Sequence, residues 1–186
     1  ASACERAGYV LLEGQALAWV PIDFDSTDAY LARLSSGRRK NIRRKLRSRA
    51  DLEIEMVPAG DARFDDAATL ADFQALFDNV YAQSEIHFDR LTAAFFREVL
   101  RDGGSGGVVF VYRHAGQMIG WNLCYEHGGK LIDKYVGFAY PQAREHNLYF
   151  VSWMHNLDYA RRRGLAHYVA GWTDPEVKSF LGARMT

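Results

Sequence analysis

The sequence predicts one α/β (α+β) unit with a mixed central sheet and flanking helices. Two stretches predict this fold class. Residues 130–182 read as strand, loop, helix, strand and short helix, which is the order of two parallel strands joined by a crossover helix. Residues 108–139 read as three strands joined by short turns at 114–116 and 127–129, which is the order of an antiparallel meander.

Composition excludes several classes of protein. The 186 residues are 48% apolar, enough for a folded domain with a substantial core. No apolar run approaches the roughly 20 residues of a membrane span, and no signal peptide is visible, so we predict a cytoplasmic protein. The chain begins at Ala1, as expected of a processed protein or a piece of a longer one. The cysteines and histidines lack the spacing of a zinc site, so we predict no metal.

Charge is unevenly distributed, although the net charge is zero. Residues 1–50 contain ten Lys or Arg and five Asp or Glu, whereas residues 51–102 contain four and twelve. This change predicts a basic N-terminal part, residues 1–50, packed on a main domain formed by residues 51–186. The two parts are expected to form one globular unit.

The N-terminal part is expected to contain two strands and two helices. Residues 9–12 and 16–22 read as a hairpin, and Ser26 or Thr27 can cap a short helix that ends near Leu34. Of the twelve residues 38–49, eight are cationic. We weigh three interpretations of this segment: a solvated helix face lying on the acidic middle of the chain, an anion site for phosphate or a nucleotide-linked substrate, and a nonspecific nucleic-acid surface.

The middle of the chain reads as a strand and two helices. Residues 52–57 alternate as a half-exposed strand does, and residues 65–81 carry apolar side chains at helical spacing. Thr92 can cap the next helix, which ends before the glycine-rich loop 103–107.

The helix after the meander is predicted from its cap, its apolar face and its end. Asn147 can cap it, and Arg161, Arg162, Arg163 and Gly164 are stop signals. The apolar stripe consists of Phe150, Trp153, Met154, Leu157 and Ala160. A helix start beside strand ends is a natural place to hold an anion.

Two segments resemble one known family. Residues 35–44, Ser-Ser-Gly-Arg-Arg-Lys-Asn-Ile-Arg-Arg, resemble a signature of Fem-like, peptidoglycan biosynthesis/recognition-type GNAT proteins. Residues 160–183, with Lys178 and Gly182-Ala183, resemble the closing element of the same branch. The resemblance covers residues 25–186 and implies the GNAT N-acyltransferase fold, with a final strand that is short or absent here.

The resemblance also implies an activity, the transfer of an acyl group to a small-molecule or peptide amine. The donor is expected to be an acyl-CoA such as acetyl-CoA, lying between the strands 131–139 and 165–171. Backbone N–H groups of the first strand would hold the oxyanion: Tyr135, Val136, Gly137 and Phe138. The following loop would hold the pyrophosphate: Gln142, Arg144, His146 and Asn147. Glu145 and Asn147 stand where the family pattern has glycines.

Candidate catalytic residues follow from the same resemblance. Lys178 would hold a phosphate or the oxyanion, the alternative being a solvent-exposed lysine. Asp133 would accept the amine's proton; we expect it to share one strand face with Leu131 and Tyr135, the alternative being an ion pair with Lys134 or with a neighbouring strand. Glu126 is a second candidate base, and Tyr168 a candidate acid. The candidate substrate-binding residues are Arg39, Arg43, Arg44, His87 and Asp89.

Two further hypotheses stay open. The donor can instead be an aminoacyl-tRNA, with a cell-wall precursor as acceptor and the basic segment contacting tRNA. The fold can also be a degenerate one that binds a ligand without catalysis.

Overall fold

The computed structural model describes residues 3–10, 14–85, 87 and 90–186. The elements, in chain order, are α1 (Ala3–Arg6), β1 (Ala18–Pro21), α2 (Thr27–Ala32), α3 (Ser36–Lys45), a 3-10 helix (Leu46–Asp51), β2 (Glu53–Pro58), a 3-10 helix (Ala62–Asp65), α4 (Ala67–Gln83), α5 (Ala93–Arg101), β3 (Gly107–His114), β4 (Gln117–His127), β5 (Lys130–Phe138), α6 (Gln142–Glu145), α7 (Leu148–Arg162), β6 (His167–Gly171), α8 (Pro175–Leu181) and β7 (Arg184–Met185).

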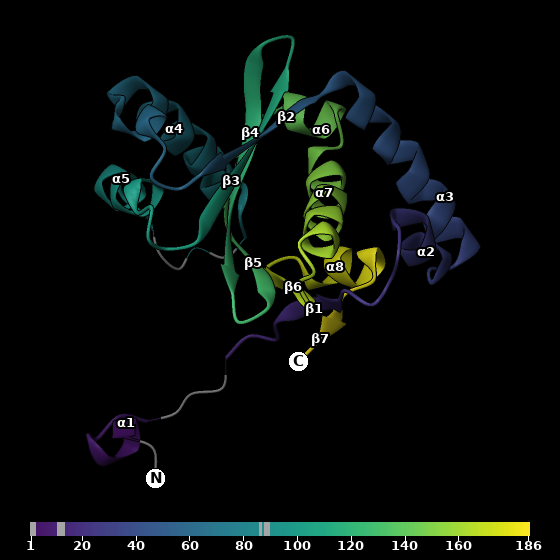
Figure 1. Cartoon of the computed structure of the whole chain (residues 1–186), viewed down its shortest axis with the longest axis horizontal. Coiled ribbons are helices and arrows are strands. Elements are labelled where there is room, and N and C mark those ends of the chain that lie inside the picture. The colour runs from purple at the N-terminus through teal and green to yellow at the C-terminus, as the bar shows by residue number, and fades with distance from the viewer. Residues whose placement is uncertain (1–2, 11–13, 86, 88–89) are drawn as a thin grey trace.

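The strands form one mixed seven-stranded sheet in the order β2-β3-β4-β5-β6-β1-β7. The β5 and β6 strands are parallel and joined through α7, and the other pairs are antiparallel, so the predicted fold class is confirmed. Helices α4 and α5 cover one face, whereas α7 crosses the other and has α3 and α8 beside it (Figure 1). In the described part of the chain, no helix is long and apolar enough to cross a membrane.

The first strand is placed differently from the sequence prediction. Its edges pair with β6 and β7, and residues 9–10 belong to no strand, so among the described residues β1 is not part of the predicted hairpin. Residues 11–13 lie outside the described part of the chain. The pairing with β6 puts part of the N-terminal segment inside the main sheet.

Most predicted helix starts are confirmed by a side-chain cap. Ser26 caps α2 and Thr92 caps α5 through hydrogen bonds to backbone N–H groups in the first turn. Asn147 precedes α7 but does not cap it through its side chain, which donates to Ser48 Oγ at 3.2 Å. Its backbone is left-handed, with φ 50° and ψ 38°, a conformation that Asn adopts more readily than most residues.

A register shift changes the predicted face of one strand residue. Leu123 pairs with Tyr135 and Cys124 with Asp133, so Lys134 is an extra residue in β5. Asp133 therefore shares a face with Leu131, as predicted, but Tyr135 packs on the opposite face, against Phe96. The expectation that Tyr135 lies beside Asp133 is wrong because simple alternation does not include the bulge.

The two segments that carry the family resemblance touch each other. The Arg38 guanidinium in α3 donates to the carbonyl oxygens of Ser179 and Phe180 at the end of α8. The Tyr30 hydroxyl donates to the Leu181 carbonyl oxygen. A Cβ at Gly182 would lie 2.7 Å from the Tyr30 oxygen, so only glycine fits there. These contacts fix the position of α8 and its Lys178.

Candidate active site

The site is built where two parallel strands separate. The β5 and β6 strands pair from Lys130 and His167 to Ile132 and Val169, and no register pair links them further on. We call the gap between residues 133–138 and 170–171 the strand fork. The other edge of β5 stays paired with β4 as far as Phe138. The strands thus separate beside α7, to which β5 is hydrogen-bonded through Asp133 and Asn156.

Asp133 stands at the point of separation and faces α7. Its Oδ2 accepts hydrogen bonds from the Tyr168 hydroxyl at 2.9 Å and from Asn156 Nδ2 at 3.0 Å. Its Oδ1 accepts from Asn122 Nδ2 at 3.3 Å. Burial raises the pKa of this carboxyl, while the hydrogen bonds from Tyr168 and Asn122 and the charge of Lys178 oppose that rise. Asp133 therefore does not make the alternative ion pair with Lys134.

Two buried asparagines extend this group. Asn156 is 0% exposed in the middle of α7, and Asn122 lies at its side in β4. Asn122 Oδ1 accepts from the Tyr112 hydroxyl at 2.8 Å. Together they form a polar cluster inside an otherwise apolar layer: Tyr112, Asn122, Asp133, Asn156 and Tyr168. The sequence prediction included Asp133 and Tyr168 and missed the two amides.

Lys178 lies in the fork and is only 3% exposed. A Cβ at Gly171 would come within 3.8 Å of Lys178 Nζ and 4.0 Å of the Asp133 carbonyl oxygen, so the ammonium group lies between the separated strands. Burial lowers its pKa to about 8, and the charges of Asp133 and Asp174 oppose the change. The alternative interpretation of Lys178 as a solvent-exposed lysine is wrong.

A hollow of about 360 Å³, which we call the hollow above the fork, opens next to Phe138 at the end of β5. It is lined by residues of α3, β5, α6 and α7: Lys45, Phe138, Tyr140, Ala143, Arg144, Asn147, Leu148, Tyr149 and Phe150. The Lys45 ammonium lies 3.5 Å from the centre of the Phe150 ring, and Arg144 lies over Tyr140 at 4.8 Å. Within the described residues the buried Tyr149 hydroxyl has no hydrogen-bond partner.

Of the predicted cofactor-binding residues, Phe138, Arg144 and Asn147 line this hollow. Gln142 and Arg144 belong to the short helix α6, which stands where a loop was expected. The His146 ring packs against the His114 ring, with 4.0 Å between their centroids and 40° between their planes. Gly137 lies against Trp121, whose Nε1 would be 2.3 Å from an added Cβ, and Val136 packs on the α7 side. The roles of these residues remain predictions.

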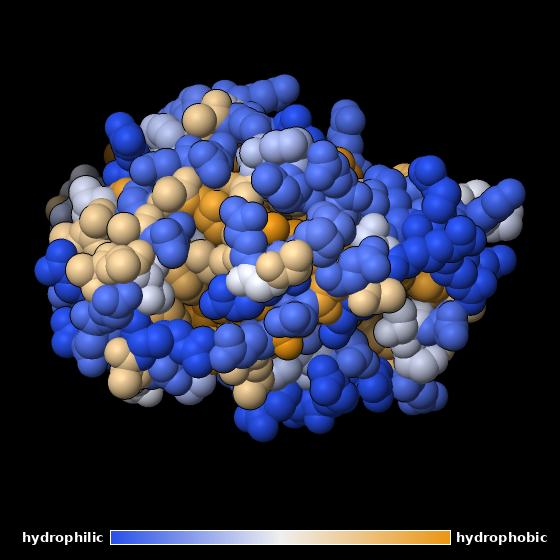
Figure 2. All heavy atoms as spheres, turned by 90° about the horizontal axis from the view of Figure 1, so that it is seen from above, coloured by the Kyte–Doolittle hydropathy of each residue, from blue (hydrophilic) through white to orange (hydrophobic). Residues whose placement is uncertain are grey.

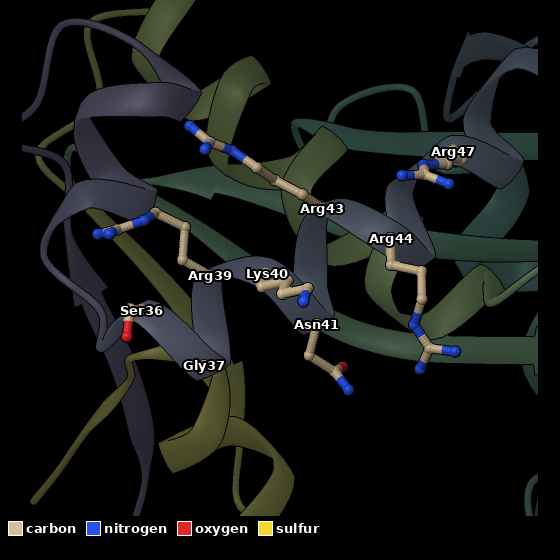
Figure 3. A pocket seen from close by; sticks show the side chains of 8 residues that line it. All are labelled: Ser36, Gly37, Arg39, Lys40, Asn41, Arg43, Arg44 and Arg47. Atoms are coloured by element: carbon tan, nitrogen blue, oxygen red, sulfur yellow. The ribbon is translucent and has the colours of Figure 1, made fainter.

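The basic residues of α3 line an open hollow of about 580 Å³. Figure 3 shows the cationic side chains spreading from one helix and the turn that follows it: Arg39, Lys40, Arg43, Arg44 and Arg47. Arg39 donates to the Ala32 and Leu34 carbonyl oxygens, and Arg43 pairs with Asp28 at 2.7 Å. The side chains of Lys40, Arg44 and Arg47 form neither a hydrogen bond nor an ion pair with any described residue.

The α3 surface does not lie on the acidic middle segment. The helix contacts α7 and α8, and α4 is on the other side of the molecule (Figure 1). Viewed from above, the end of the molecule that holds α2 and α3 is predominantly hydrophilic (Figure 2). The interpretation of the basic segment as a face packed on acidic residues 51–102 is therefore wrong.

Three other predicted site residues lie away from the fork or outside the description. Glu126 lies near the C-terminal end of β4. It accepts a hydrogen bond from Arg163 Nε at 3.0 Å and another from the Tyr159 hydroxyl. His87 Nε2 lies 2.7 Å from the Tyr81 carbonyl oxygen. Asp89 lies outside the described residues. No group of three or more metal-binding side chains occurs among the residues that the structure describes.

Comparison with known families decides the identity of the fold. The model of a family described as acetyltransferase (GNAT) domain matches residues 36–179, well over half of the chain. The chain belongs to the acetyltransferase (GNAT) domain family. A search of curated proteins found no match.

Solved structures share the GNAT fold at low sequence identity. A crystal structure of FemX superposes with a TM-score of 0.71 at 13% identity, over 94% of this chain and 60% of that one. The structure of L-PGS from Bacillus licheniformis gives 0.64 at 9% identity, over 92% and 57%. A tandem GNAT protein from the clavulanic acid biosynthesis pathway gives 0.53 at 12% identity, over 97% and 53%. The chain thus spans little more than half the length of these proteins.

Proposed function

We propose that this chain transfers an acyl group to an amine. Its membership in the acetyltransferase (GNAT) domain family supports the class of reaction. The observation that carries the proposal is the strand fork, where β5 and β6 separate beside a half-buried carboxylate, Asp133, and a buried ammonium, Lys178. A base and a cation in a site largely shielded from water are the two groups that direct amine attack on an ester or thioester requires.

The two groups have separate roles in the proposed reaction. The neutral amine nitrogen forms a bond to the acyl carbon, and the proton that it loses moves to the Asp133 carboxylate. The Lys178 ammonium stabilises the negative charge that develops on the acyl oxygen. The bond from the acyl carbon to the leaving sulfur or oxygen then breaks, and the leaving group takes a proton from water.

We propose an acyl-CoA as the donor, and acetyl-CoA as its simplest form. The hollow above the fork has two cations, Lys45 and Arg144, and the start of α7, which suit phosphate groups. The α6 helix occupies the place of the glycine-rich turn, so these side chains would carry more of the phosphate binding than backbone N–H groups would.

A second candidate donor is an aminoacyl-tRNA, with a cell-wall precursor as acceptor. The unpaired cations on α3 favour it: Lys40, Arg44 and Arg47 lie at spacings of four and three residues, on one side of the helix and its extension. Cations without protein partners attract the phosphates of a nucleic acid without a loss of internal ion pairs.

Calorimetric titration with acetyl-CoA and longer acyl-CoAs tests the first donor. We expect saturable binding that Arg144→Ala weakens, because Arg144 lines the hollow above the fork. Arg97→Ala is the matched control, since Arg97 is an exposed arginine on α5, on the other face of the sheet. If the folded protein binds none of these thioesters, the acyl-CoA donor is excluded, and titration with charged tRNA follows.

An activity assay tests transfer itself. The protein is incubated with the donor that binds and with a panel of primary amines, and the acylated amine is measured by mass spectrometry. Acylation that depends on the protein and falls in Asp133→Asn is expected. Donor binding without acylation of any amine would favour the degenerate fold that binds without catalysis.

A further inference from the structure

The polar cluster around Asp133 consists of hydrogen-bond donors directed at one carboxylate. Both amides and the Tyr168 hydroxyl donate to it, at 2.9 to 3.3 Å. An ionised carboxylate only accepts hydrogen bonds, whereas a protonated one must also donate. The arrangement therefore favours the ionised form and opposes the effect of burial.

Asn156 determines the direction of the shared hydrogen bonds. Its Nδ2 lies 3.0 Å from Asp133 Oδ2 and 3.2 Å from the Tyr168 oxygen. Because the Tyr168 oxygen accepts from Asn156, its own proton is left to point at Asp133. Asn156 Oδ1 in turn accepts from Asn122, whose orientation is fixed by the Tyr112 hydroxyl. Asn156 thus orients the Tyr168 donor, and it shares the orientation of the Asn122 donor with Tyr112.

Packing alone gives no reason for amides at these places. Asn156 lies on the buried face of α7 among Trp153, Leu157 and Ala160, where an apolar side chain would avoid the cost of burying an amide. Asn122 lies between the apolar residues Trp121 and Leu123 on β4. Both amides instead satisfy each other and Asp133.

We propose that Asn156, assisted by Asn122, is a positioning residue that holds Asp133 as a proton acceptor at the strand fork. The proposal rests on the proposed function and assigns roles to two residues that the family resemblance did not include. Asn156 acts through Asp133 and does not touch the substrate. When Asp133 takes the amine's proton, the Tyr168 hydroxyl remains in place to stabilise the carboxyl group.

Other groups that interact with this carboxylate come from five elements. Lys178 of α8 attracts it, and the buried Cys124 thiol of β4 lies close to it. The remaining groups are the hydroxyls of Tyr112 on β3, Tyr149 on α7 and Tyr168 on β6. Replacing Asn156 removes none of these groups, so a change in Asp133 reports the lost amide and the orientation that this amide gives to the Tyr168 hydroxyl.

The test measures the titration of Asp133 directly, by NMR of its carboxyl carbon in the full chain. Asn156→Leu keeps a similar side-chain volume. In this variant the midpoint is expected to rise by about one to two pH units, which is the shift that corresponds to the loss of one hydrogen bond to a charged group. Ser152→Ala is the matched control. Ser152 is also buried on α7, but its hydroxyl donates only to the Tyr149 carbonyl oxygen of the same helix.

A second variant covers the case in which Asn156→Leu fails to fold. Asn122→Ala removes the donor to the other carboxylate oxygen and is expected to move the midpoint in the same direction. A midpoint that is unchanged in the folded variants, or that moves equally in Ser152→Ala, would overturn the proposal.

The pH dependence of kcat/KM separates this proposal from the proposed function. With acetyl-CoA and an accepted amine, the acidic limb is expected to move to higher pH in Asn156→Leu by the same amount as the Asp133 midpoint. If the midpoint moves but no donor and amine react, the positioning role is supported and the transferase function fails. If transfer occurs and its acidic limb does not move, the positioning role is overturned.

Discussion

The two faces of the central sheet are built from the same strands and differ in their chemistry. The face under α4 and α5 is packed with rings, including Phe73, Phe96 and Trp121. The face under α7 is also apolar but encloses the polar cluster and, beside it, Lys178. Since neighbouring residues of a strand point to opposite faces, β4 places Trp121 on one side and Asn122 on the other.

The difference assigns separate roles to the two faces, because one mainly stabilises the fold and the other carries the groups of the proposed reaction. Burial of aromatic side chains stabilises the α4 face, and the Trp121 indole satisfies its one N–H group on the Phe73 carbonyl oxygen at 3.0 Å. The α7 face holds two charged groups and two amides that an apolar core would not need. We therefore expect substitutions on the first face to change unfolding, and substitutions on the second to change transfer.

The largest expected effect is on the aromatic face. Phe96 is buried and contacts the rings of Phe77, Trp121 and Tyr135. Phe96→Ala removes this packing and leaves a cavity, so it should lower the free energy of unfolding by about 3–5 kcal/mol. Urea denaturation measures the change. A loss below about 1 kcal/mol would show that this face is not the main source of stability.

The next effect concerns the base at the fork. Asp133→Asn keeps the shape of the side chain but cannot take a proton, so kcat/KM should fall at least about 100-fold while circular dichroism stays unchanged. Asp158→Asn is the matched control, because Asp158 is a carboxylate of α7 that pairs with Arg161 at 2.8 Å. Full activity in Asp133→Asn, together with loss of activity in Glu126→Gln, would move the base to Glu126.

A smaller effect, on the pH dependence of stability, is expected from a histidine of α7 that the fold keeps uncharged. Burial lowers the pKa of His155 to about 4, and no described residue hydrogen-bonds its buried Nε2. Below about pH 6.5 the unfolded state takes up a proton that the folded state refuses, so stability falls as the pH falls towards 4. Between pH 7 and pH 5.5 this costs about 1 kcal/mol.

His155→Leu should remove that part of the pH dependence. Urea denaturation of the wild type and the variant at the two pH values measures it. His127→Leu, at the exposed end of β4, serves as the control for replacing a histidine with leucine. An identical slope with pH in His155→Leu and the wild type would contradict the assignment.

The smallest expected effect is at the surface of α3. Arg43 and Asp28 form an ion pair at 2.7 Å in which both side chains are more than half exposed. Arg43→Ala should change the free energy of unfolding by less than about 0.5 kcal/mol. If the hollow binds a polyanion, the same variant should weaken charged-tRNA binding, and a variant that unfolds instead would assign Arg43 a structural role.

The sequence predicted the elements that rest on local signals. The glycines at 116, 128 and 129 have positive φ angles, as the predicted hairpin turns require. The caps at Ser26 and Thr92 were predicted for similar reasons. The parallel pairing of β5 with β6 was predicted from the crossover helix that joins them. The place of β1 was not predictable in this way, because its partners β6 and β7 lie some 150 residues further along the chain.

The candidate site was only partly predictable. Asp133, Tyr168 and Lys178 were named from the family resemblance, and the structure brings them to one place. The bulge at Lys134 leaves no mark in the hydrophobic pattern, so Tyr135 was assigned to the wrong face. Asn122 and Asn156 carry a weaker signal, which is an amide inside an otherwise apolar strand or helix face. Their proximity depends on contacts between residues far apart in the sequence, so the cluster could not be predicted from local patterns.

Hydrogen exchange with the donor bound tests the central claim most directly, namely that the strand fork receives the acyl donor. Amide exchange is measured by mass spectrometry with and without saturating donor, acetyl-CoA or charged tRNA, whichever binds in the titration. The account predicts slower exchange in residues 133–138 and 170–171, with the β2–β3 edge of the sheet unchanged. Saturable binding that slows exchange elsewhere and leaves the fork unaffected would contradict it.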